Sequence, residues 1–287
     1  MGIFSYPSQR VQDWLSQEWC IFTGRRIDPD EHPWLMGPFG NVDVIEDQYV
    51  ERLAREENLD VRKNEPGAGL VPSLDEWNLT AEQASSLHPE IRRFYERSIE
   101  YELEVWFRWC RLFHPGAKLI SILYSRRLQQ LNLPLDPLDT ARGIRSQIYR
   151  LYDTSQRVRH TIWYRHLKST GDVIYSGVYS NCRLPSGETA LKVIFPLPRG
   201  NATVVMRIGV LEDGSLDLVS SGSGFGDAGF YFLLNDAKMR HHAKYLRSFR
   251  ERIHVYVDKE ETLRADHTMS VWNKTALRLH YKITPIP

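Results

Sequence analysis

The chain has 287 residues, of which 42% are hydrophobic and 25% charged, and its formal net charge is +1. This length suffices for one large domain or two ordinary ones with a sizeable core. The near-neutral charge excludes a polyanionic partner bound by the whole surface, and the apolar content excludes extended disorder.

The chain shows no signal for secretion or for a membrane span. No apolar run follows the first residues, as a secretory signal requires, and none approaches the roughly 20 residues that cross a bilayer as a helix. Cys20, Cys110 and Cys182 stand far apart, without a CxxC pair. Neither a disulfide framework nor a thiolate metal site is therefore expected. These features predict a cytoplasmic protein and leave its oligomeric state open.

The N-terminal region, residues 1–150, is predicted to be mainly helical. The spacing of apolar residues indicates one helix over residues 11–22 and a short charged helix over residues 43–57. The strongest signal covers residues 88–111, where apolar types recur every three or four positions after a proline suited to a first helical turn. A further helix is expected over residues 117–132.

The C-terminal region, residues 151–287, is predicted to be an antiparallel β domain, either a barrel or a strongly curved sheet. Segments rich in β-branched and aromatic residues alternate with turn sequences. They cover residues 158–167, 172–180, 189–195, 202–210 and 228–234. In residues 252–258 and 277–283, apolar and polar types alternate strictly, which indicates one buried face. The fold class is therefore α+β, a helical N-terminal part followed by an antiparallel β-rich domain.

Gly224, Gly226 and Gly229 match the GxGxxG spacing of dinucleotide-binding proteins. That site requires a helix that opens at the glycines, so that the pyrophosphate meets the helix N-terminus. Here the residues that follow, FYFLL, predict a strand. We interpret the glycines as a hairpin or bulge, which could alternatively gate a pocket, and we expect no cofactor.

The histidines show no metal-binding spacing. His241 and His242 are adjacent, so a strand or helix would direct their rings apart, and we interpret them as part of a solvated basic loop. No HExxH or comparable pattern occurs. We therefore expect no metal.

Arg264, Asp266 and His267 form the strongest polar cluster for catalysis. In a strand, Arg264 and Asp266 share one face and could pair, while His267 lies on the other face. If that other face lines a cavity, His267 could act as a general acid or base. The alternative is an ordinary ion pair beside a histidine at the edge of the core.

Residues 105–168 carry 12 basic and 3 acidic residues, whereas residues 40–104 carry 7 basic and 16 acidic. The two segments could neutralise each other within one helical unit. Alternatively the basic segment, with Arg126 and Arg127, could lie on an anionic membrane surface or contact another protein. Nothing here matches a defined nucleic-acid-binding module, so a nucleic-acid partner is not expected.

The leading hypothesis is that the β domain binds an apolar small molecule or a lipid, because aromatic residues are frequent there and such sites are concave and mostly apolar. The candidate ligand-binding residues are Trp163, Tyr175, Tyr179, Phe230, Phe232, Tyr256, His267 and Trp272. One alternative is an isomerase or cyclase-type enzyme that uses His267 with Asp266 or Arg264. The other is a membrane or interaction module that acts through residues 105–168. All ligand hypotheses depend on a cavity, rather than a filled interior, within the β domain.

Overall fold

The structure, a computed structural model, describes residues 11–40, 45, 48–120, 128, 130 and 143–286. The helices whose bounds the structure describes are short and lie between residues 11 and 120. The α-helices are α1 Val11–Thr23, α2 Gln48–Glu57, α3 Ala81–Ser86, α4 Pro89–Glu96 and α5 His114–Ile120. The 3-10 helices are η1 Pro33–Leu35, η2 Leu74–Trp77 and η3 Ser98–Glu100.

Strands make up most of the remainder. Four begin before residue 150: β1 Arg25–Arg26, β2 Asp60–Lys63, β3 Tyr101–Trp109 and β4 Ile144–Tyr152. The next six are β5 Val158–Leu167, β6 Val173–Arg183, β7 Thr189–Leu197, β8 Gly200–Val210, β9 Leu216–Val219 and β10 Gly229–Asn235. The last four are β11 His241–Tyr245, β12 Phe249–Val257, β13 Leu263–Val271 and β14 Lys274–Pro285. The segments predicted as strands after residue 150 all form strands.

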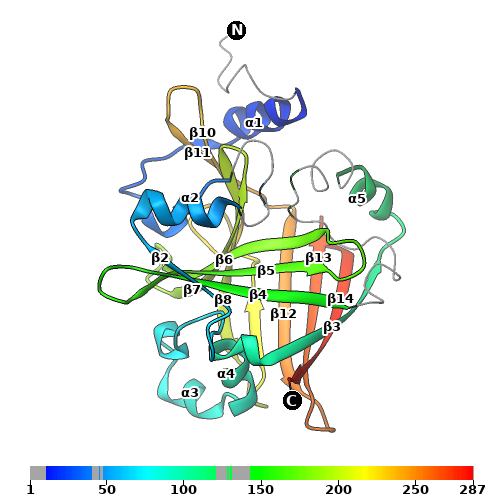
Figure 1. Cartoon of the computed structure of the whole chain (residues 1–287). Helices are drawn as coiled ribbons and strands as arrows, with labels where there is room; N and C mark the ends of the chain where they lie inside the picture. The colour runs from blue at the N-terminus through cyan, green and yellow to red at the C-terminus, as the bar shows by residue number, and fades with distance from the viewer. Residues whose placement is uncertain are drawn as a thin grey trace.

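All these strands belong to one antiparallel sheet, with 14 strands among the described residues. Its main path runs β2-β4-β5-β6-β7-β8-β9-β12-β13-β14-β3, and β10 and β11 branch from β8. In Figure 1, β4, β5 and β6 run across the view while β12, β13 and β14 run down it, so the sheet bends strongly between its two halves. Short β9 joins the halves, because it pairs with β8 on one side and β12 on the other.

The sheet is strongly curved but is not closed into a barrel. Its terminal strands on the main path, β2 and β3, are not paired with each other in the part of the chain that the structure describes. The α+β fold class predicted from the sequence is confirmed, and of its two versions of the β domain the curved sheet is the one observed.

Helices cover both faces of the sheet. On the outer face, Tyr49, Val50 and Leu53 of α2 pack in one cluster with buried residues of β4 to β7. On the inner face, Phe94 and Tyr95 of α4 pack in another cluster with residues of β5, β7, β8 and β12 to β14. The inner face of the curved sheet therefore contains the main core.

The helix predicted over residues 88–111 is wrong beyond Glu96. Residues 101–109 form β3, in which Tyr101, Leu103 and Val105 are buried while the two glutamates between them are exposed. β3 pairs with β14 along its length. This long-range pairing satisfies the backbone hydrogen-bonding groups of β3 and buries the face formed by every second residue. The same apolar residues also fit a helical spacing, but the stability gained by pairing exceeds their local preference for a helix.

The expected division into residues 1–150 and 151–287 does not correspond to a break in the sheet. β4 extends across residue 150, and β2 and β3 pair with strands of the C-terminal region. The helix expected over residues 117–132 overlaps α5, which ends at Ile120. Much of its remainder, including Arg126 and Arg127, lies outside the described residues.

The glycine motif forms the loop between β9 and β10, and a strand rather than a helix follows it. Gly226 has a φ of +96°, which glycine adopts without the steric cost of a side chain. Its N–H donates to the hydroxyl of Tyr231 at 3.2 Å. β9 and β10 do not pair with each other but both pair with β8, so the loop is not a hairpin. The strand that begins at Gly229 stands where a dinucleotide motif would require a helix.

The two adjacent histidines do not lie in a solvated loop, so that interpretation was wrong. They begin β11, and buried His242 lies 3.1 Å from the Asp236 carboxylate. Asp236 is fully buried and also accepts a hydrogen bond from Arg240 at 2.7 Å. Burial by itself would raise the pKa of Asp236, but the hydrogen bonds from Arg240 and His242 hold it well below its usual range. This cluster fixes the turn between β10 and β11.

Candidate functional site

A cavity of about 580 Å³ lies inside the bend of the sheet. Its walls are inward-facing side chains from both halves, β5 to β8 on one side and β12 to β14 on the other. Residues of α1 line it too, as do Phe94 and Tyr95 of α4. Figure 1 shows these two helices at opposite ends of the bent sheet. The size lies within the range of small-molecule sites, roughly 300–1,000 Å³.

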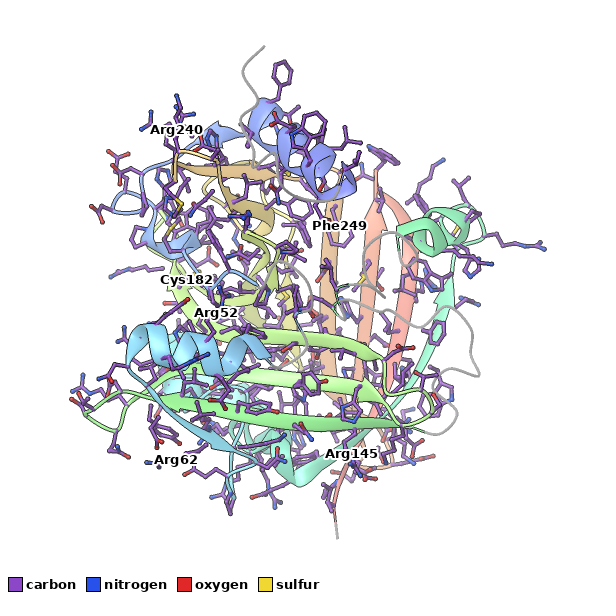
Figure 2. The ribbon with its side chains drawn as sticks, turned by 45° about the horizontal axis from the view of Figure 1, so that its top comes forward. Arg52, Arg62, Arg145, Cys182, Arg240 and Phe249 are labelled. Carbon is purple, nitrogen blue, oxygen red and sulfur yellow. The ribbon has the colours of Figure 1, made fainter. Side chains whose placement is uncertain are left out.

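The strand alternation explains why the lining is apolar. Along β12, Ile253 and Val255 face inward, and along β14, Leu279 and Ile283 do so. Phe249, labelled in Figure 2, lines the cavity from the first residue of β12. These are the faces that the period-two patterns of residues 252–258 and 277–283 predicted to be buried.

Small residues leave room for large rings. Gly177 on β6 lies opposite Trp163 on β5, and a Cβ at Gly177 would lie only 3.2 Å from Val193 and 3.3 Å from Phe195. Ala265 of β13 lines the same space. At one end, α1 is tied to the sheet because the Gln17 side chain donates to the Pro198 carbonyl at 3.2 Å.

Most of the sequence-predicted ligand-binding residues line this cavity. They are Trp163, Tyr175, Tyr179, Phe230, Phe232 and His267. The other two lie elsewhere. Tyr256 is on the outer face of β12, where its ring stacks on His254 at 5.2 Å, and Trp272 is 74% exposed in the turn between β13 and β14. Neither Tyr256 nor Trp272 lines this cavity.

Among the described residues, Arg165 is the one arginine in the cavity lining, and it is only 2% exposed. Its guanidinium carbon lies 4.8 Å from the ring centre of Trp163 and 5.5 Å from those of Tyr175 and Tyr281. Nη1 donates a long hydrogen bond to the Tyr175 hydroxyl at 3.4 Å. Nε and Nη2 are buried without a hydrogen-bond partner in the described part of the chain.

The charge on Arg165 persists despite this environment. Burial lowers the pKa of its guanidinium, but the hydroxyls of Tyr175 and Tyr281 raise it, and the net direction is upward. Arginine is in any case protonated at all physiological pH values. The cavity therefore contains a permanent positive charge.

His267 and Glu251 form a second polar pair in the lining. His267 Nε2 lies 3.5 Å from the Glu251 carboxylate, and both side chains are largely buried. The backbone of Glu251 is held by Ser220, whose hydroxyl accepts its N–H at 2.9 Å. A histidine beside a carboxylate in an enclosed space has the composition of an acid–base pair.

The other two catalytic candidates do not join His267. Arg264 donates to Asp258 at 2.8 Å, and Asp266 lies 2.7 Å from His280. The suggested pairing of Arg264 with Asp266 is thus replaced by an ion pair of Arg264 with Asp258 and a separate hydrogen bond between Asp266 and His280 on the outer face. Only His267 of the three lines the cavity.

Sequence reasoning missed Arg165 and Glu251. A signal for Arg165 was present, because it stands two residues after Trp163 in a predicted strand and so shares its face. Glu251 stands two residues before the inward-facing Ile253. Arg165 belongs to a predicted strand, whereas Glu251 lies one residue before the predicted segment 252–258. A charged residue at an inward-facing position is unusual and therefore informative.

The described residues contain no group of three or more histidine, cysteine, aspartate or glutamate side chains that could hold a metal ion. Within those same ranges, no helix has both the length and the apolar character needed to cross a membrane.

No protein-family model matches the chain, and no solved structure matches it. The chain is similar to the uncharacterized membrane protein YndJ of Bacillus subtilis (strain 168), with 28% identity over 167 residues. The match covers 55% of this chain and 29% of YndJ. The chain therefore spans less than a third of this relative, which is itself uncharacterised, and the likeness assigns no activity.

Proposed function

We propose that this protein binds an apolar small molecule or a lipid chain inside the bend of its sheet, without catalysis. The observation that supports this most strongly is the cavity of about 580 Å³ lined mainly by aliphatic and aromatic side chains. Native interiors pack as densely as organic crystals and rarely contain voids much larger than a water molecule. A space of this size and composition is suited to an apolar ligand, since apolar cavities offer water few partners.

The similarity to YndJ is compatible with such a ligand. That protein is named a membrane protein, and amphiphilic molecules partition into membranes. The cytoplasmic location expected for this chain stays a prediction.

A binding assay with a cavity-filling variant tests the proposal. The fluorescence of an apolar naphthylamine dye should rise on adding the protein and fall again when dodecanol displaces it. Ala265→Phe places a ring in the cavity and should weaken dye binding at least tenfold, because the volume for the ligand is lost. Thr268→Phe adds the same ring on the opposite face of β13 and should leave binding unchanged.

If the wild-type protein does not bind the dye or dodecanol, the proposal fails. It fails equally if Ala265→Phe, shown by circular dichroism to be folded, binds as tightly as Thr268→Phe. A retained affinity would place the probe on the surface rather than inside the sheet.

An isomerase or cyclase-type activity is the second candidate, and it is favoured by one observation. His267 and Glu251 face the same apolar space at 3.5 Å from each other, as a proton-transferring pair would. The test is to incubate an apolar metabolite extract with wild-type protein and His267→Gln. Catalysis is supported if the wild-type protein converts a compound to an isomer of equal mass and His267→Gln does not. It is refuted if the extracts incubated with the two proteins are identical.

A membrane or interaction role through residues 105–168 stays a prediction, because Arg126 and Arg127 lie outside the described residues. It would require salt-sensitive binding to anionic vesicles that is lost when both arginines are replaced by glutamate.

A further inference from the structure

Arg165 is a buried charged side chain in the lining of a mainly apolar cavity. It is 2% exposed, and in the described part of the chain its polar contacts are to tyrosine hydroxyls: Nη1 donates the long hydrogen bond to Tyr175, and the Tyr281 hydroxyl also interacts with the guanidinium. Nε and Nη2 are buried without partners in the described ranges. Buried polar groups are almost always hydrogen-bonded, and a buried charge costs several kcal/mol unless it is paired. Arg165 is therefore the feature of the cavity that most needs an explanation.

No acidic side chain of the lining neutralises Arg165 by direct contact. The acidic residues that line the cavity within the described chain are Asp13 and Glu251. The Glu251 carboxylate lies against His267 at 3.5 Å, and no ion pair joins Arg165 to either acidic residue. In the part of the chain that the structure describes, no carboxylate pairs with the donors of Arg165.

The neighbouring rings stabilise the cation. Trp163, Tyr175 and Tyr281 approach the guanidinium at 4.8, 5.5 and 5.5 Å from its central carbon. Such contacts favour a positive charge in an apolar site, but they satisfy no N–H group. The N–H groups lie in the guanidinium plane and form a fork that matches two oxygens of a carboxylate or a phosphate.

We infer that the ligand of this cavity is an amphiphile with one anionic group, a carboxylate or a phosphate, which binds to the guanidinium of Arg165. Its apolar part occupies the remaining space between the two halves of the sheet. This inference rests on the proposed function, because it specifies the chemical class that the same cavity accepts.

Equilibrium binding of four amphiphiles with the same dodecyl chain tests the inference. They are dodecanoate, dodecyl phosphate, dodecanol and dodecyltrimethylammonium, each titrated at neutral pH into the full chain freed of bound lipid. At least one of the two anions should bind roughly tenfold or more tightly than dodecanol, as a charge-assisted hydrogen bond implies. The cationic amphiphile should bind most weakly. Whichever anion is preferred identifies the head group as a carboxylate or a phosphate.

Variants at Arg165 assign the preference to this residue. Arg165→Met keeps a similar length and removes the charge, so the preference for the anion should fall below about threefold while the affinity for dodecanol is retained. Arg165→Lys should keep part of the preference. Arg145→Met, which removes an exposed arginine of β4 labelled in Figure 2, should behave as the wild type.

The outcomes separate this inference from the proposed function. If dodecanol binds as tightly as both anions, or the cationic amphiphile binds as tightly as either, the head-group inference is overturned while the cavity still binds apolar chains. If none of the four binds, the proposed function itself fails. The wild-type comparison needs no variant, so the inference stays testable even if Arg165→Met does not fold.

Discussion

Replacing Arg165 with methionine should stabilise the ligand-free protein. The wild-type fold buries a charge that donates a long hydrogen bond to Tyr175, at 3.4 Å, and has no carboxylate partner in the described chain. The burial of such a charge costs several kcal/mol. Contacts with Trp163, Tyr175 and Tyr281 offset part of this cost, at roughly 0.5–2 kcal/mol for a favourable cation–π arrangement. The net gain on substitution should be about 2 kcal/mol in the free energy of unfolding.

Urea denaturation followed by tryptophan fluorescence measures this change. The protein is first unfolded to remove bound lipid and then refolded. The midpoint of thermal unfolding should rise by roughly 4 °C for a domain of this size. Arg145→Met is the matched control and should change the free energy of unfolding by no more than about 0.5 kcal/mol, as is usual at exposed positions.

Adding dodecanoate should reverse the order of stability. Ligand that binds only the folded state raises its stability by mass action. The wild-type protein should therefore gain stability from dodecanoate, and Arg165→Met should gain much less. If ligand-free Arg165→Met is less stable than wild type by about 2 kcal/mol or more, the side chain is structurally satisfied within the fold and the reasoning is refuted.

Three further predictions concern the framework around the cavity. The pKa of Asp236 is lower in the folded than in the unfolded state, so its contribution to stability is present above about pH 4 and is lost as the pH falls. Asp236→Asn should lower the free energy of unfolding in urea by about 2–4 kcal/mol at neutral pH and should weaken the dependence of stability on acid. An unchanged acid profile would contradict this. Gly69→Ala should lower the free energy of unfolding by about 1–3 kcal/mol, since a Cβ would lie 2.1 Å from the backbone of α4. Its control is Gly116→Ala, where a Cβ would have no atom within 4 Å and stability should change by at most about 1 kcal/mol. Equal effects of the two substitutions would refute the close contact. A maleimide at neutral pH should label exposed Cys110 rapidly and spare Cys20, because burial raises the pKa of the Cys20 thiol to about 12. Rapid modification of both cysteines, measured by mass spectrometry, would contradict this.

The C-terminal strands could be predicted because their signal is local. Alternating apolar and polar residues fix which face is buried, and the turn sequences fix where each strand ends. The pattern of residues 252–258 therefore predicted correctly that Ile253 and Val255 face the interior.

β3 was missed because its strand state depends on a partner far away in the sequence. Its apolar residues fit a helical spacing as well as an alternating one, and α4 directly precedes it. Only pairing with β14, roughly 170 residues later, decides between the two. The alternation of Tyr101, Leu103 and Val105 with two glutamates was the available signal.

The candidate site was predicted in its aromatic part and missed in its charged part. Trp163 and Tyr175 were identified by their type. The position of Arg165 on the same face as Trp163 could be read from the sequence, but whether a carboxylate pairs with it depends on how the sheet bends, and none does in the described part of the chain. The same holds for Glu251, which meets His267 across two adjacent strands.

The most direct test of the account is a crystal structure of the full chain with dodecanoate bound. Density is expected for one extended chain between the two halves of the sheet, with its carboxylate at hydrogen-bonding distance from Arg165. A cavity filled only by water at saturating dodecanoate, or a chain bound on the outer face, would contradict it.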